Sequence, residues 1–181
     1  MTLGFRAWGE EASPRIAVYD TSEDTWKYAF YPLDEPESLN GGWVGLSDIA
    51  PLGECKFMVL ERDNQGGPDA VIKRVYTIDL GDYSWEDGTV LEKTLYVDLM
   101  ESGDLSKTNG QTIEKVEGLT VTAEGAIWIN TDNDGVDDSS GESLLTVIGT
   151  YESEESSSGA SKVLTTAFSC LAPILAIFAA F

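Results

Sequence analysis

The sequence predicts an all-β protein built from short antiparallel strands. Runs that alternate apolar and polar residues, and that are rich in β-branched and aromatic side chains, recur along the chain. Gly, Pro, Asp and Asn separate these runs, and no stretch before the C-terminal tail has the apolar periodicity of an amphipathic helix. The predicted strands cover 15–20, 25–33, 45–52, 56–63, 72–80, 91–99, 117–123, 126–132 and 143–151.

Two of these stretches repeat one another. "GLSDIAPLGECKFMVLERDNQG" begins at Gly45, and "GLTVTAEGAIWINTDNDG" begins 73 residues later, at Gly118. Each runs Gly-Leu-Ser/Thr, strand, glycine-containing turn, apolar strand and Asp-Asn-x-Gly. Four strands in about 70 residues is the pattern of a β-propeller blade with extended loops. Residues 15–33 then supply the last two strands of one blade, 45–99 a full blade, and 117–151 the first three strands of another.

These strands make about two to two and a half four-stranded blades, whereas a closed propeller needs about four to eight. The predicted fold is therefore an incomplete β-propeller that cannot close alone, and we expect the chain to be the C-terminal piece of a longer protein. Residues 1–14 would be a truncated lead-in, 15–151 the partial propeller, 152–162 a Ser/Glu-rich linker and 163–181 a hydrophobic tail. The tryptophans are interpreted as blade packing rather than as a sugar-binding platform: Trp26, Trp43, Trp85 and Trp128.

Composition excludes several functions. The formal net charge is −21, from 11 basic and 32 acidic residues, and such a field repels nucleic acid. The chain has no histidine, which excludes Ser-His-Asp catalysis and histidine-ligated zinc within it. Any metal site must use oxygen ligands, which suit calcium or magnesium. Because Cys170 lies in the apolar tail, we expect no disulfide between it and Cys55, the only other cysteine.

The tail from Val163 to Phe181 contains 19 residues without a charge. As a helix it would span roughly 28 Å, close to the thickness of a bilayer core. Small residues and a short polar spacer precede it, as in a GPI-attachment signal. A retained membrane helix and a buried core helix remain the alternatives. Both membrane readings place the protein at the extracellular face of the plasma membrane, although residues 1–15 do not resemble a signal peptide.

The stretch "NTDNDGVDDSSGE", from Asn130 to Glu142, carries four aspartates. Oxygen-bearing side chains at alternate positions, followed by Gly135, approximate a D-x-D-x-D-G calcium loop. The bidentate glutamate of an EF-hand falls one residue late and no flanking helices are evident, so we predict a propeller-type or thrombospondin-repeat-like calcium loop, with a solvated Asp/Gly turn as the alternative. The proposed metal ligands are Asn130, Asp132, Asp134 and Asp138.

The corresponding loop of the first repeat mixes basic and acidic side chains. In a metal-assisted phosphoesterase, carboxylates hold a metal that activates water, and a cation binds the phosphoryl oxygens. The alternative is that these residues only form cross-strand ion pairs. Asp48 and Glu117, which open the two repeats, are weaker candidates for the same channel. The proposed catalytic residues are Glu61, Arg62, Asp63 and Lys73.

Taken together, "RIAVYD", "YAFYPLD", "GLSDIAPL", "KFMVLERDNQGGPDAVIKRVYTIDL", "KTLYVDL" and "VEGLTVTAEGAIWINTDNDGVDDSSGESLL" resemble the phytase-like domain family, described as having esterase-like activity of phytase. The resemblance runs from about Arg15 to Thr150, lacks the N-terminal half of the domain, and shows extra aspartates after "EGL". It implies a calcium-associated propeller that hydrolyses small phosphate esters, with the mixed cluster near the central mouth. We therefore expect part of a secreted, membrane-tethered phosphoric ester hydrolase, active only if the full propeller is present. The alternative is a non-catalytic, calcium-binding fragment that acts as a cell-surface binding module.

Overall fold

The computed structural model describes residues 14–81, 85–86, 88–108, 111–112, 115–132, 143–152 and 174–180. Its elements are β1 (Arg15–Asp20), β2 (Thr25–Phe30), β3 (Val44–Gly53), β4 (Lys56–Asp63), η1 (Gly67–Asp69), β5 (Lys73–Asp79), β6 (Thr94–Asp98), α1 (Leu99–Ser102), β7 (Ser106–Thr108), β8 (Gln111–Thr112), β9 (Val116–Val121), β10 (Ala126–Thr131), β11 (Leu145–Thr150) and β12 (Ile174–Ala180). Strands dominate, so the all-β prediction is confirmed. The predicted strands correspond to β1–β6 and β9–β11.

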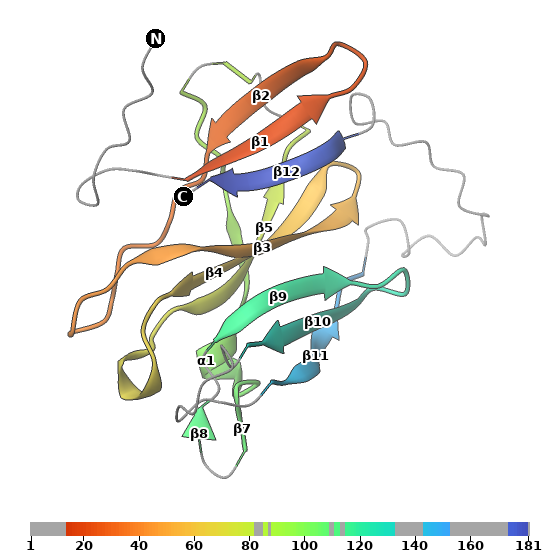
Figure 1. Ribbon diagram of the computed structural model, residues 1–181. Helices are drawn as coiled ribbons and strands as arrows, with labels where there is room; N and C mark the ends of the chain where they lie inside the picture. The colour runs from red at the N-terminus through yellow and green to blue at the C-terminus, as the bar shows by residue number, and fades with distance from the viewer. Residues whose placement is uncertain are drawn as a thin grey trace.

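Within the described residues the strands form three stacked antiparallel sheets (Figure 1). The first sheet has the order β12-β1-β2, the middle sheet β3-β4-β5-β6 and the third sheet β11-β10-β9, while β7 and β8 form a separate two-stranded ladder. This confirms the predicted grouping of strands 15–33, 45–99 and 117–151. The three sheets do not close into a ring, so the part of the chain that the structure describes contains no complete propeller.

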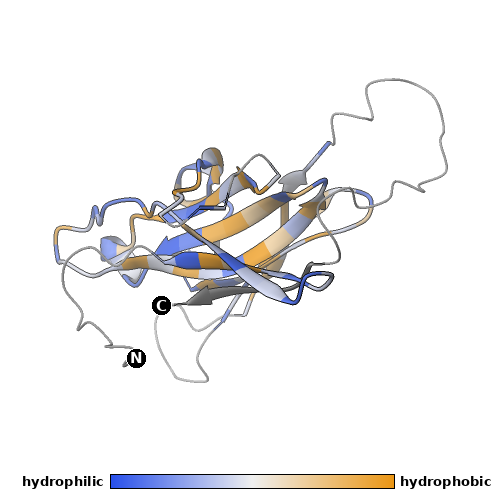
Figure 2. Ribbon diagram, turned by 90° about the horizontal axis from the view of Figure 1, so that it is seen from above, coloured by the Kyte–Doolittle hydropathy of each residue, from blue (hydrophilic) through white to orange (hydrophobic). Residues whose placement is uncertain are grey.

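Two hydrophobic clusters hold the stack together. Along β4, Phe57 and Val59 face the first sheet, while Met58 and Leu60 face the third. Because the centre of β4 is buried on both faces, its residues from Phe57 to Leu60 form a continuous apolar run rather than an alternating one. Full burial of each such side chain stabilises the fold by about 1.5–3 kcal/mol. Figure 2 shows apolar segments along the central strands and hydrophilic segments both at strand ends and in the connecting turns.

The C-terminal tail differs from its prediction. Instead of a hydrophobic helix, residues Ile174–Ala180 form strand β12, which pairs antiparallel with β1. The edge of β1 offers unpaired backbone donors and acceptors, and an extended apolar segment satisfies them. Residues 163–173 lie outside the described residues. No described helix is both long and apolar enough to cross a membrane.

The expectation of no disulfide is also wrong, because Cys55 is disulfide-bonded. The chain's other cysteine is Cys170, which lies outside the described residues. Cys55 sits in the two-residue turn between β3 and β4, where Glu54 has φ +47° and Cys55 has φ +66°. Positive φ at both central residues is the geometry of the tight turns that join antiparallel strands. The tail was assigned to a membrane from its hydropathy and from the small residues and polar spacer before it, and none of these features indicates a disulfide.

Gly125 should tolerate no side chain. It has φ +85°, and a Cβ added there would lie 2.3 Å from the backbone oxygen of Tyr151. Gly125→Ala is therefore expected to lower the free energy of unfolding by about 2–4 kcal/mol, measured by urea denaturation. Gly53→Ala is the matched control: Gly53 has φ +92° but open space around it, so only the backbone strain of about 1–2 kcal/mol applies. Equal losses in the two variants would show that the contact with Tyr151 is unimportant.

Candidate functional site

The proposed catalytic residues lie together at one end of the middle sheet, where β4 ends and β5 begins. In the register of these strands Glu61 is opposite Arg74, and Arg62 is opposite Lys73. Opposite residues in an antiparallel pair share a face, and neighbours along a strand alternate. Glu61 and Arg74 therefore face the first sheet, and Arg62 faces the third. The sequence cluster is thus divided between the two sides of one sheet.

Asp63 and Lys73 form a buried ion pair. The side chain of Lys73 is 0% exposed and that of Asp63 3%. Lys73 Nζ also donates to the backbone oxygens of Asp63 and Gln65, at 3.0 and 3.2 Å. Asp63 Oδ2 accepts from the N–H groups of Val71 and Ile72, each at 2.8 Å. This pair therefore ties both ends of the β4–β5 connection together.

The pKa of Asp63 follows from these contacts. Burial alone would raise it, because it disfavours the charged form. The ion pair with Lys73 and the two backbone donors outweigh burial, and the pKa of Asp63 lies below its usual value. Asp63 is consequently an ionised anchor of the loop rather than a group poised to exchange a proton.

Glu61 is fully buried between the first and middle sheets. Its Oε1 accepts from the backbone N–H of Asp34 at 2.6 Å, and its Oε2 accepts from Lys93 Nζ at 2.7 Å. Burial raises the pKa of Glu61 more than these two donors lower it. A carboxyl with a raised pKa is the kind of group that general acid–base catalysis uses.

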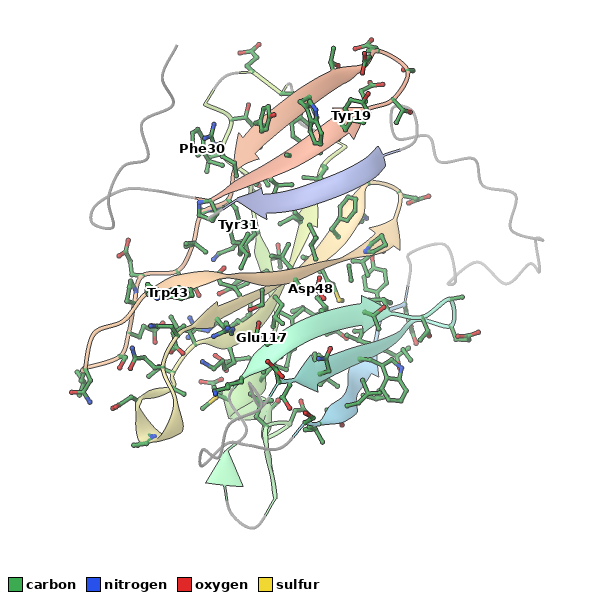
Figure 3. The ribbon with its side chains drawn as sticks, viewed as in Figure 1. Tyr19, Phe30, Tyr31, Trp43, Asp48 and Glu117 are labelled. Atoms are coloured by element: carbon green, nitrogen blue, oxygen red, sulfur yellow. The ribbon has the colours of Figure 1, made fainter. Side chains whose placement is uncertain are left out.

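Two tyrosine rings flank the same lysine. Lys93 Nζ lies 4.1 Å from the ring centre of Tyr76 and 5.1 Å from that of Tyr31. The Tyr31 hydroxyl is buried and has no hydrogen-bond partner among the described residues. Burial, followed by the negative charge of Glu61, raises the pKa of Tyr31. Tyr31 lies between the first and middle sheets (Figure 3). Lys93 is thus held by carboxylates and by aromatic faces together.

Asp34 connects this buried group to an open cleft. Its Oδ1 accepts from Lys93 at 2.7 Å, and its Oδ2 accepts from Arg74 Nη1 at 2.6 Å and from the Tyr76 hydroxyl. Burial would raise the pKa of Asp34, but the bonds from Lys93, Tyr76 and Arg74 hold it below its usual value. Asp34 is therefore ionised and shared among three donors.

Arg74 is the only basic side chain that lines the cleft among the described residues. It also pairs with Glu37 at 2.9 Å and with Asp98 at 2.8 Å. The cleft has a volume of about 470 Å³. It is lined by Asp34, Glu35, Glu37, Arg74, Tyr76, Leu95, Asp98 and Glu101. The site therefore combines a single guanidinium with several carboxylates.

On the opposite face, Arg62 joins the middle sheet to the third. It donates to Ser47 Oγ at 2.8 Å and pairs with Glu117. Asp48 makes a second link, because its Oδ2 accepts from the N–H of Leu119 at 2.7 Å. Figure 3 shows Asp48 and Glu117 where these sheets meet. Asp48 and Glu117, the acidic residues at the start of the two repeats, therefore both connect the middle sheet to the third.

The predicted calcium loop is only partly described. Asn130 and Asp132 lie exposed at the end of β10, and their oxygen atoms suit a hard cation. Asp134 and Asp138 lie outside the described residues. Among the residues that the structure does describe, no group of three or more Asp, Glu, Cys or His side chains is placed to hold a metal ion. The calcium site remains a prediction.

Sequence reasoning missed Asp34, Tyr76, Lys93 and Asp98. Asp34 and Lys93 lie 27 and 32 residues from Glu61 along the chain, in stretches whose sequence indicated no site role for either residue. Arg74 was adjacent to a proposed residue, and the strand register alone would have placed it opposite Glu61. The register was therefore the one signal that could have extended the site.

Residues 4–135 match the family Phytase-like, described as esterase-like activity of phytase. No curated protein and no solved structure gives a significant match. Because the family match covers well over half of the 181 residues, the chain belongs to the phytase-like family.

Proposed function

We propose that this chain is part of a phosphoric ester hydrolase that acts on a small phosphate ester. Family membership supports the reaction class. The observation that carries the proposal is the cleft that Arg74 lines, which Asp34 connects to the buried Glu61–Lys93 pair. A guanidinium recognises phosphoryl oxygens through fixed parallel donors. A carboxyl with a raised pKa can transfer the proton that hydrolysis requires.

The residues take different roles in this proposal. Arg74 binds the phosphoryl group in the cleft, whereas Arg62, which the sequence also assigned to phosphate, lies on the other face of the middle sheet, paired with Glu117. Glu61 moves a proton, while Asp63 and Lys73 hold the loop that positions it. The many carboxylates would repel a phosphate dianion, and calcium held by Asn130, Asp132, Asp134 and Asp138 would supply the compensating charge. Calcium is thus an expected cofactor of the proposed reaction.

The proposal is tested by steady-state phosphatase assays on this chain and on a version extended upstream, each with calcium and with a chelator. We expect turnover from the version with a complete propeller, and with calcium only. Arg74→Gln should lower kcat/KM about tenfold to a hundredfold, the effect of losing a hydrogen bond to a charged group. Arg62→Gln is the matched control, since it removes an arginine from the opposite face. An Arg74→Gln variant that keeps its fold and its activity would contradict the role assigned to Arg74.

A non-catalytic, calcium-binding module is the second candidate. It is favoured by the pairing of the cations: Arg62, Lys73, Arg74 and Lys93 all make ion pairs with protein carboxylates. A phosphate would have to displace one of these partners. Calcium binding by calorimetry without any turnover would support this candidate over the hydrolase.

Attachment to the extracellular face of a membrane through residues 163–181 also stays a proposal. A tail that is cleaved off, or that enters a bilayer, cannot at the same time pair with β1 as β12. The two arrangements of the tail therefore exclude each other in any one molecule.

A further inference from the structure

The outer face of the first sheet carries a row of aromatic side chains. Residues Ile16 and Val18 of β1 point into the core, so the alternate residues of β1 and their β2 partners point outward. The Tyr19 and Trp26 rings lie 4.9 Å apart, and the Trp26 and Tyr28 rings 6.4 Å apart. We define the aromatic face as Tyr19, Trp26, Tyr28 and Phe30. Trp26 and Tyr28 are 43% and 49% exposed.

The outer face of the third sheet is also apolar. Ile127 and Ile129 of β10 point into the core, so Trp128 points outward, opposite Val147 of β11. Leu145 extends the same face and is 66% exposed, while Val147 is 44% exposed. We define the aliphatic face as Trp128, Leu145 and Val147.

These two faces lie at opposite ends of the stack, with the middle sheet between them (Figure 1). Both sheet–sheet interfaces inside the chain are made by apolar faces of the same kind. Exposed apolar patches of this kind mark sites of association. The described residues therefore present two surfaces suited to further β-sheets, one at each end.

We infer that two copies of this chain associate head to tail, the aromatic face of each packing on the aliphatic face of the other. The two ends differ in composition, which favours a heterologous contact over a self-complementary one. Two copies bring together six sheets of the blade type, within the range of about four to eight blades that close a propeller. Closure by two copies covers all four exposed faces, whereas pairing of identical faces leaves two of them in solvent.

The net charge of −21 per chain opposes this association. Like charges on the two copies repel each other, and salt screens the repulsion. Dimer formation is therefore expected to strengthen as ionic strength rises, because its attraction is apolar. A contact held by ion pairs would weaken under the same change.

Sedimentation equilibrium of the full chain tests the inference, with one variant at each face. Wild-type protein should be a dimer at high salt. Tyr28→Asp and Val147→Asp should each be largely monomeric. In a dimer of two identical variant copies, each of the two contacts would contain one altered face. Both side chains are exposed, so the variants should fold, and circular dichroism checks this. Leu39→Asp is the matched control: Leu39 is 101% exposed but lies on neither face, so this variant should remain dimeric.

Mixing the two variants is the decisive measurement. In a mixed dimer one contact joins the intact aliphatic face of Tyr28→Asp to the intact aromatic face of Val147→Asp. The mixture should therefore dimerise more strongly than either variant alone. A monomeric wild type at every salt concentration overturns the inference, as do dimers lost in only one of the two variants. Open-ended oligomers of the wild type would overturn the closed two-copy ring.

Discussion

Replacing Lys73 with methionine is expected to lower the free energy of unfolding by about 3–5 kcal/mol, the usual cost of breaking a buried ion pair. Lys73 is fully buried and is the cationic partner of Asp63. Without it the Asp63 carboxylate would remain buried with only backbone donors, and the oxygens of Asp63 and Gln65 would lose a donor. Urea denaturation measures this loss.

Two controls separate the ion pair from the loss of a side chain. The double variant Asp63→Leu/Lys73→Met removes both charges and should recover part of the stability, since two apolar groups leave no unpaired charge. Lys27→Met removes a half-exposed cation 3.9 Å from Asp20, and it should change stability by only about 0–1 kcal/mol. If Lys73→Met were as mild as Lys27→Met, Lys73 would not be the anchor of the β4–β5 connection.

Much of the strand pattern was predictable because it depends on local periodicity. The repeat from Gly45 and Gly118 places equivalent strands in equivalent sheets, and the structure follows it in β3–β4 and β9–β10. Short elements were not predictable in this way. Helix α1 has four residues and depends on Asp98, whose side chain accepts from the N–H groups of Met100 and Glu101. A single turn of this kind has no sequence period to detect.

The tail shows the limit of hydropathy. A uniformly apolar run is compatible with a membrane helix or with a strand, because it has no alternation to distinguish them. Ile174–Ala180 forms a strand because it pairs with β1, from which it is separated by more than 150 residues in the sequence. No local pattern encodes such a contact, and the disulfide of Cys55 escaped prediction for the same reason.

The sequence predicted which residues of the candidate site lie close together, but not their burial. Glu61, Arg62, Asp63 and Lys73 are adjacent through the β4–β5 hairpin, so their proximity follows from the strands themselves. Their burial did not follow, and it changes the roles that we assign to Asp63 and Lys73. The open cleft depends on Asp34, which arrives from the connection after β2. The position of Asp34 depends on how the first sheet packs on the middle sheet, which local sequence patterns do not predict.

Lys93→Met is expected to cost about 3–5 kcal/mol at neutral pH, because it leaves Glu61 as a buried carboxylate without its cation. Burial already raises the pKa of Glu61 above its usual value. A carboxyl whose folded pKa is raised binds its proton more tightly in the folded state, so folding is favoured when it is protonated. That contribution disappears as the pH rises through the folded pKa.

Without Lys93 the pKa of Glu61 should rise further, and the variant can relieve the buried charge by taking up a proton. The loss of stability relative to wild type should therefore shrink as the pH is lowered from about 7 to about 5, since protonation of Glu61 then replaces the missing cation. Asp34 has the opposite effect on stability. Its pKa is lowered in the wild type, so the stability that it contributes falls as the pH is lowered. Lys93→Met removes one of the donors that lower this pKa.

Urea denaturation of Lys93→Met beside Lys93→Met/Glu61→Gln isolates the effect of Glu61, because the second variant has no carboxyl at residue 61. The double variant should regain stability at neutral pH and lose the pH dependence that distinguishes the single variant. A single variant that is equally destabilised at both pH values would mean that Glu61 does not carry a buried charge.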